Sequence, residues 1–272
     1  MGITADREQE FYDAAYSQFL NLPASDLACN RRTLEADLAN PAKPIYERRR
    51  LYGKILETLL AESVAGAKVL DYGCGTGDWG LMLAGEGAQV TFLDLSPVAI
   101  QVVLRRAAAS GVEVQGVARD ASNLSCFHNE EFDLIYGSAA VHHTLKYPNA
   151  LDELLRVLRP SGRLVLAETY GNNKILNAAR KLGWKMLDQA DEQGEEIVFN
   201  DTHVALLRER MTQVEVMPIN LFAMAKRMFR GKFKSTTVRG AVETLEKLDS
   251  AILSAAPKLA RYCGEVIVAG RK

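Results

Sequence analysis

The stretch from Val69 to Gly77, VLDYGCGTG, decides the fold. A short apolar run over 67–72 ends at closely spaced glycines, which indicates a buried strand that leads through a tight loop into a helix over 77–85. Glycines in such a loop tolerate positive φ and let a ligand approach the backbone closely. The stretch therefore predicts a nucleotide-like ligand at the carboxyl end of the first strand of an α/β sheet.

Strands and helices alternate on the carboxyl side of this loop, a pattern typical of a parallel sheet built from strand–helix–strand units. The predicted strands cover 89–93, 112–118, 132–136 and 163–168, with helices over 97–110 and 149–158. Two later strand candidates, 214–217 and 265–269, lie far apart in the sequence.

The remaining segments read as helical. Residues 1–66, broken by the proline-containing stretch 40–44, are predicted to form a helical cap. Residues 67–272 are predicted to form the ligand-binding domain, with helical insertions at about 171–211 and 221–254 and a polar stretch over 188–196. We expect the cap and the insertions to cover the site of a second substrate.

Composition sets broad limits on function. The chain has 272 residues and a formal net charge of −1, so no global field draws nucleic acid to it. Its four cysteines have no C-x-x-C spacing, which argues against a zinc site and a disulfide framework. We expect no metal, no transmembrane segment and a cytoplasmic location, because no signal-peptide pattern or membrane-length apolar run is present.

The glycine loop fits two cofactors. Gly75, Gly77 and Gly80 satisfy the G-x-G-x-x-G pattern of dinucleotide-binding sites, with an acid, Asp94, further along. A dinucleotide places a pyrophosphate at the helix N-terminus, where Asp71 and Asp78 would repel it. No Lys or Arg lies between Val69 and Glu86 to offset that repulsion, which costs about 1–4 kcal/mol per close pair of charges. A cationic cofactor without phosphate fits better.

VLDYGCGTG resembles the first motif of the class I S-adenosylmethionine-dependent methyltransferases, and FLDLSPVAI over 92–100 resembles the second. The resemblance extends over residues 67–168. It implies a Rossmann-like, mostly parallel seven-stranded sheet whose last two strands form an antiparallel hairpin. It also implies S-adenosylmethionine as the cofactor and S-adenosylhomocysteine as its product.

The resemblance implies a role for the residues of the first motif. The carboxylate of Asp71 orients the loop and reaches the methionine ammonium of the cofactor; the alternative is an acid that caps the following helix. Gly73, Gly75 and Gly77 form the backbone floor of the site, and Cys74 is a small neutral filler of the loop.

The ends of the next two strands supply further candidates. Asp94 can accept hydrogen bonds from both ribose hydroxyls; its alternative role as a helix N-cap is already filled by Ser96. Leu95 is expected to pack on the adenine. The resemblance implies that Asp120 binds the adenine amino group and that the backbone of Ala121 meets a ring nitrogen. A solvated loop aspartate is the alternative for Asp120.

Strand four leads into GSAAVHHT over 137–144, which the resemblance places at the transferred methyl group. His142 or His143 is a candidate general base, because imidazole titrates near working pH, although both can simply shape the pocket. Ser138 is expected to bind the cofactor through its backbone. Tyr12 and Tyr16 lie on an N-terminal helix that either closes over the cofactor or packs as an ordinary amphipathic helix.

The methyl acceptor is expected to be a small molecule. The N-P-P-Y motif of base or glutamine amino-group methylation is absent after strand four, which favours oxygen or carbon acceptors. The basic segment 226–234 is either a solvated helix end or a patch for an acidic or lipid-associated acceptor; nucleic acid is the least favoured partner. Two rival functions remain: an NAD-dependent oxidoreductase and a non-catalytic cofactor-binding module. Oligomeric state is not predicted.

Overall fold

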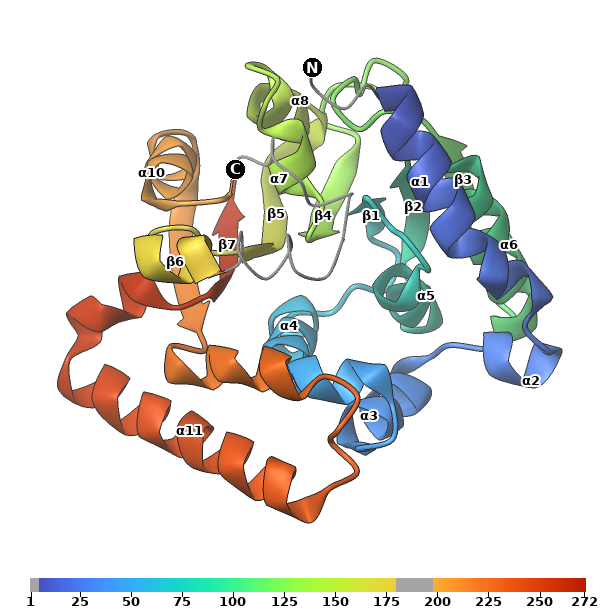
Figure 1. Ribbon diagram of the computed structural model, residues 1–272. Coiled ribbons are helices and arrows are strands. Elements are labelled where there is room, and N and C mark those ends of the chain that lie inside the picture. Colours follow the sequence, from blue (N-terminus) through green and yellow to red (C-terminus); the bar gives the residue numbers. More distant parts are fainter. Residues whose placement is uncertain (1–4, 180–197) are drawn as a thin grey trace.

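The computed structural model describes residues 5–179 and 198–272. Within these ranges the chain forms one seven-stranded sheet in the order β3-β2-β1-β4-β5-β7-β6 (Figure 1). The strands are β1 Lys68–Tyr72, β2 Gln89–Asp94, β3 Gln115–Ala118, β4 Phe132–Ser138, β5 Leu158–Thr169, β6 Thr212–Ile219 and β7 Glu265–Arg271. β1 to β5 run parallel, and β7 is antiparallel to both β5 and β6. The predicted Rossmann-like fold with an antiparallel last pair is confirmed.

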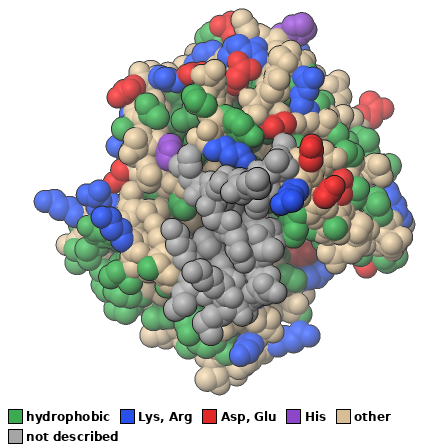
Figure 2. Space-filling view, turned by 45° about the horizontal axis from the view of Figure 1, so that its top comes forward, with side chains coloured by type: hydrophobic (Ala, Val, Ile, Leu, Met, Phe, Trp, Pro, Cys, Tyr) green, Lys and Arg blue, Asp and Glu red, His purple; other side chains and the backbone are tan. Residues whose placement is uncertain are grey.

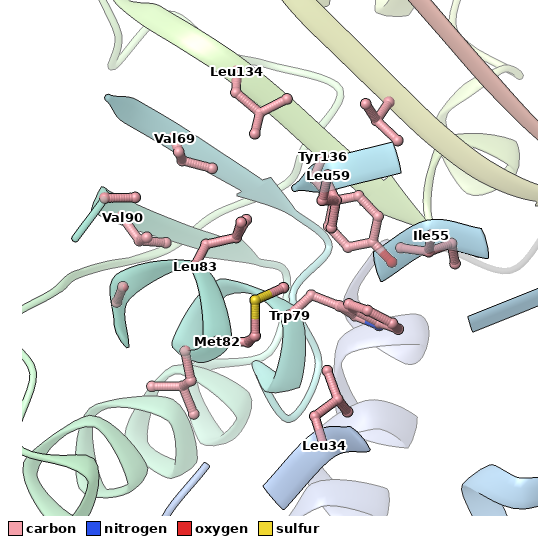
Figure 3. Packing of buried hydrophobic residues seen from close by; sticks show 14 of the residues in the cluster. Leu34, Ile55, Leu59, Val69, Trp79, Met82, Leu83, Val90, Leu134 and Tyr136 are labelled. Atoms are coloured by element: carbon pink, nitrogen blue, oxygen red, sulfur yellow. The ribbon is translucent and has the colours of Figure 1, made fainter. Parts of the chain in front are cut away.

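Alternating side chains of the central strands divide the apolar core between the two faces of the sheet. Val69 and Leu134 belong to a buried cluster with residues of α4 Arg49–Leu59, α5 Asp78–Gly85 and α6 Pro97–Ser110. Figure 3 shows part of this cluster. Leu70 and Ile135 belong to a second cluster with residues of α8 Ala150–Val157 and α10 Asp201–Arg210. This period-2 division is what strands covered on both faces require.

The N-terminal helical region has two structural roles. α1 Ala5–Ser17 crosses α6, as Figure 1 shows at the right of the view, and is followed by η1 Gln18–Asn21 and α2 Ala24–Leu27. α3 Arg31–Ala39, η2 Pro44–Arg48 and α4 lie nearer the sheet, and Leu51, Ile55 and Leu59 of α4 are completely buried in the core. α4 is thus an integral layer of the fold, whereas the division of domains at residue 66 stays a prediction.

The segment 221–254, predicted as a helical insertion, contains more than one helix in the structure. It consists of the 3₁₀ helix η4 Phe222–Phe229 and of α11 Thr236–Ala255, with η5 Pro257–Tyr262 after it. Gly231 interrupts it at φ 75°, and the Ser235 hydroxyl accepts a hydrogen bond from the backbone N–H of Val238 to start α11. The predicted polar stretch 188–196 lies outside the described residues.

Two strand boundaries also differ from the prediction. β5 begins at Leu158, five residues before the predicted start at residue 163, and accommodates Ser161 at φ 63°; β3 begins at Gln115 and is shorter than the predicted strand 112–118. No helix among the described residues is both long and apolar enough to cross a bilayer.

Candidate functional site

A cavity of about 400 Å³ lies at the carboxyl ends of β1, β2 and β4. β1 pairs with β2 on one side and with β4 on the other. The first three strands are therefore added in one direction from β1, and the chain then crosses back to add β4 and β5 in the other direction. Such a switch point is where open α/β sheets bind ligands. Most of the predicted site residues line this cavity: Tyr12, Tyr16, Asp71, Gly73, Cys74, Gly75, Asp94, Leu95, Asp120, Ala121, Ser138 and His143. Gly77 and His142 are not lining residues.

The glycine loop is shaped by its backbone conformation and by close contacts. Gly73, Gly75 and Gly77 all have positive φ, and the N–H of Gly73 donates to the Leu93 carbonyl at 2.8 Å. A Cβ on Gly80, in the first turn of α5, would lie 2.2 Å from the Phe92 ring and 2.7 Å from Asp71 Oδ2. Gly80 therefore lets α5 approach the sheet closely enough to place the loop beside the cavity.

Asp71 ends β1 in a buried position, 3% exposed. Its Oδ2 accepts a hydrogen bond from the Gly80 N–H at 3.1 Å, so it caps the start of α5, and it also lines the cavity. Burial raises the pKa of this carboxyl to about 7, against the lowering effect of that hydrogen bond. A cation in the cavity would stabilise its ionised form.

Asp94 connects the two motifs. Its Oδ2 accepts from the Gly75 N–H at 2.8 Å and its Oδ1 from the Ser96 N–H at 2.9 Å. The hydroxyl of Ser96 caps α6 by accepting from the Ala99 N–H at 3.0 Å, which leaves Asp94 for the loop and the cavity. Burial raises the pKa of Asp94. Asp120, on the far side of the cavity, accepts from the Ser122 N–H at 2.8 Å.

The structure corrects one part of the sequence argument about charge. No base lies near Asp78 in the sequence, yet Arg106 of α6 donates to Asp78 Oδ1 at 2.8 Å. Asp78 is therefore paired, and the electrostatic case against a pyrophosphate rests mainly on Asp71.

The two histidines of α7 Val141–Thr144 have different surroundings. His142 is buried, and its Nδ1 lies 2.7 Å from Oε2 of Glu168, whose other oxygen accepts from the Val141 N–H at 2.9 Å. His143 faces the cavity; its Nδ1 lies 2.9 Å from Glu8 Oε1 and its Nε2 lies 3.3 Å from the Tyr12 hydroxyl. The hydrogen bond with His143 lowers the pKa of Glu8.

α1 forms one wall of the cavity. The rings of Tyr12 and Tyr16 stack with centroids 5.9 Å apart, and the Tyr16 hydroxyl lies 3.0 Å from where a Cβ of Gly75 would be. Asp13 of the same helix accepts from the Ser96 hydroxyl and so attaches α1 to the start of α6.

Residues 69–162 match the family model described as "Methyltransferase domain". A demethylmenaquinone methyltransferase from Clavibacter sepedonicus is 36% identical over 115 residues, which cover 42% of this chain and 46% of that protein. A ubiquinone biosynthesis O-methyltransferase from Salmonella paratyphi A is 30% identical over 139 residues, 51% of this chain and 57% of that protein.

Residues 69–162 of this chain are therefore similar to methyltransferase domains. The matched regions span about half the length of these curated relatives. The crystal structure of the YcgJ protein from Bacillus subtilis, 21% identical, covers 82% of this chain and 98% of YcgJ with a TM-score of 0.53, and this likeness shows the shared fold.

Several residues at the cavity were not predicted from the sequence. Glu8 and Lys146 approach from opposite sides of the cavity mouth, 3.6 Å apart, and Tyr52, Trp79 and Tyr136 line one end. Trp79, Tyr136 and Lys146 lie within two residues of a predicted motif, but the motifs do not mark them. Glu8 and Tyr52 lie in segments that read as ordinary helix, so only the tertiary arrangement brings them to the site.

Proposed function

We propose that this chain transfers the methyl group of S-adenosylmethionine to an oxygen or carbon atom of a small molecule by direct in-line displacement. The observation that carries the proposal is the position of His143, which faces the cavity while Glu8 holds its Nδ1 at 2.9 Å. The reaction needs little more from the protein than alignment of two reactants, exclusion of water and removal of one proton.

The residues around the glycine loop fit the cofactor. The positive-φ glycines leave backbone open beside the cavity, and Asp71, Asp94 and Asp120 all line it. In the proposed arrangement Asp94 binds the ribose hydroxyls, Asp120 and Ala121 bind the adenine, and Asp71 meets the ammonium. When bound, the cofactor supplies an activated, electrophilic methyl group, so the protein's own groups need not activate it.

His143 is the proposed general base. A carboxylate on Nδ1 fixes the ring orientation and favours a proton on that nitrogen, which leaves Nε2 free to accept one. Nε2 is 3.3 Å from the Tyr12 hydroxyl. In the proposed arrangement the acceptor hydroxyl lies beside the Tyr12 hydroxyl or replaces it as the partner of Nε2. His142 is the weaker candidate, because its ring is engaged by Glu168 and does not line the cavity. It is better suited to positioning α7.

An oxygen acceptor is favoured within this proposal. One relative is named an O-methyltransferase, and both relatives are named for the biosynthesis or methylation of small molecules. On the described part of the face in Figure 2, basic and acidic side chains are interspersed, which gives no support to a nucleic-acid partner.

The basic segment 226–234 gives limited support to an acidic or lipid-associated acceptor. Lys226 is completely buried against Glu265, and Arg230 is paired with Glu47 at 3.2 Å. Lys232 and Lys234 are exposed and remain candidates for such contacts.

The proposal is tested by measuring S-adenosylhomocysteine formed from S-adenosylmethionine with a panel of phenols and active-methylene compounds. Acceptor-dependent product from the intact chain, with His143→Ala much slower, supports it. Tight cofactor binding without product from any acceptor would favour the non-catalytic module.

A further inference from the structure

The cavity has an aromatic end that the assigned roles do not use. Tyr52 of α4, Trp79 of α5 and Tyr136 of β4 line it together. The Tyr52 ring meets the Trp79 ring edge-on with centroids 5.4 Å apart, and Trp79 meets Tyr136 at 5.9 Å. Figure 3 shows the Tyr136 ring extending from its strand toward Trp79 and toward Ile55 of α4. Two hydroxyls are thus set into an otherwise apolar end of the site.

The Tyr136 hydroxyl is buried, in a residue only 1% exposed. Among the described residues no group meets it in hydrogen-bond geometry, and its one polar neighbour on the same strand is the Ser138 side chain, which acts to lower the pKa of Tyr136 against the raising effect of burial. Buried polar groups in folded proteins nearly always have a partner, and an exception at a cavity wall points to a group supplied from outside the chain. A ligand oxygen or a bridging polar group at this end would satisfy it.

The Tyr52 hydroxyl is polarised by a cation. Arg48 Nη1 donates to it at 3.0 Å, so the hydroxyl acts as an acceptor there and its own proton is free to be donated elsewhere. The Arg48 guanidinium also lies over the Tyr52 ring, 4.9 Å from its centroid. Tyr52 is therefore held as a hydrogen-bond donor at the wall of the cavity.

Positive charge exceeds negative charge behind Tyr52. Glu265 is completely buried and lies within salt-bridge distance of Lys226 at 3.1 Å, Arg48 at 3.4 Å and Arg227 at 3.7 Å. Glu265 cannot neutralise all of these cations. On the cavity side the nearest lining acid is Asp71, beside Tyr136 in the sheet register and set into the base of the glycine loop. The field behind the tyrosines therefore favours a negatively charged oxygen.

We propose that the hydroxyls of Tyr52 and Tyr136 form a subsite for an anionic oxygen, a carboxylate or a phenolate, with Arg48 as the cation that orients and polarises Tyr52. The proposal rests on the proposed function, because it assigns part of the same cavity. Two sources carry such a group: the amino-acid carboxylate of the cofactor and an acidic group on the acceptor.

Calorimetric titration of the wild-type chain and of the Tyr52→Phe and Tyr136→Phe variants distinguishes these sources. The probes are S-adenosylhomocysteine, 5′-methylthioadenosine, which lacks the amino-acid part, and benzoate added to the chain saturated with S-adenosylhomocysteine. Tyr262→Phe, on the exposed η5, is the matched control. Tyr136→Phe removes a hydroxyl that has no partner in full hydrogen-bond geometry, so that variant should still fold.

If the cofactor carboxylate occupies the subsite, either variant binds S-adenosylhomocysteine at least about tenfold more weakly, while 5′-methylthioadenosine binds unchanged. If the acceptor supplies the anion, S-adenosylhomocysteine binds unchanged and benzoate binding is lost in both variants. Both results support the subsite. Two results overturn the subsite. In the first, both variants bind all probes as the wild type does. In the second, benzoate does not bind the wild type and both variants keep the wild-type affinity for S-adenosylhomocysteine. The proposed function fails separately, by absence of methyl transfer in the wild-type chain.

Discussion

The carboxylate of Glu8 lies 2.9 Å from Nδ1 of His143 and joins the N-terminal helix to the loop after β4 across the mouth of the cavity. Lys146 lies 3.6 Å from the other oxygen of Glu8. This contact both orients the proposed base and holds α1 against the site. A residue that precedes the matched region 69–162 thus contacts two residues within it.

The His143–Glu8 pair predicts a kinetic signature. Replacing His143 by Ala should lower kcat by about 10²- to 10⁴-fold, the range typical of a lost general base, while S-adenosylhomocysteine affinity changes little. Glu8→Gln should lower kcat less, because the ring loses the charged partner that orients it but keeps its place at the cavity. Steady-state kinetics with an identified acceptor measure both. His128→Gln, in an exposed loop, is the control, and equal rates in all four proteins would remove His143 from the mechanism.

Asp71 predicts a pH dependence of cofactor binding. Its pKa is raised from 3.8 to about 7, so the free chain loses the negative charge as pH falls through neutrality. The ammonium of S-adenosylhomocysteine prefers the ionised carboxylate, and affinity should therefore decline by about tenfold per pH unit below about pH 7. Asp71→Asn should bind more weakly at high pH and show a flatter profile. A steep profile for 5′-methylthioadenosine, which has no ammonium, would assign the titration to another group.

The close approach of α5 to the sheet depends on Gly80. A Cβ there would meet the Phe92 ring at 2.2 Å, so Gly80→Ala should destabilise the fold and displace Asp71; we expect about 1–3 kcal/mol, as for overpacked sites. Gly240 in α11 has nothing within 4 Å of its would-be Cβ. Gly240→Ala should instead stabilise the chain by about 0.5–1 kcal/mol. Urea denaturation compares the two, and equal effects would refute the packing argument.

The buried charges around Glu265 predict an asymmetry between partners. Burial raises the pKa of Glu265, but Lys226, Arg48 and Arg227 outweigh it and hold the pKa at about 2. Glu265→Gln leaves Lys226 buried without its counter-charge and should cost about 3–5 kcal/mol of unfolding free energy. Lys226→Met should cost less, because Glu265 keeps Arg48 and the Asn220 amide, which donates at 2.6 Å. The reverse order in urea denaturation would contradict this assignment.

Sequence predicted the fold well where the signal was local. The VLDYGCGTG loop and the alternating strands and helices that follow it predicted the sheet, and Asp71, Asp94 and Asp120 all line the cavity at one edge of it. That edge follows from parallel strands alone. The roles of these side chains toward a ligand stay predictions.

The charge partners of the site residues and the burial of Lys226 could not be predicted, because they depend on contacts between distant segments. The partner of Asp78, Arg106, and the partner of His143, Glu8, lie in other helices, and nothing in their local sequence marks them. The basic segment appeared solvated, yet Lys226 is completely buried because Glu265 of the last strand lies opposite it. Pairing of this kind is decided by the tertiary fold and not by helical or strand periodicity.

The most direct test of the central claim is calorimetric titration of the purified chain with S-adenosylhomocysteine and, separately, with NADH, repeated on Asp94→Ala. We predict micromolar binding of S-adenosylhomocysteine, no binding of NADH, and affinity lost by at least about tenfold in the variant, which removes the proposed ribose ligand. Binding of NADH alone would contradict the account and move the chain to the oxidoreductases.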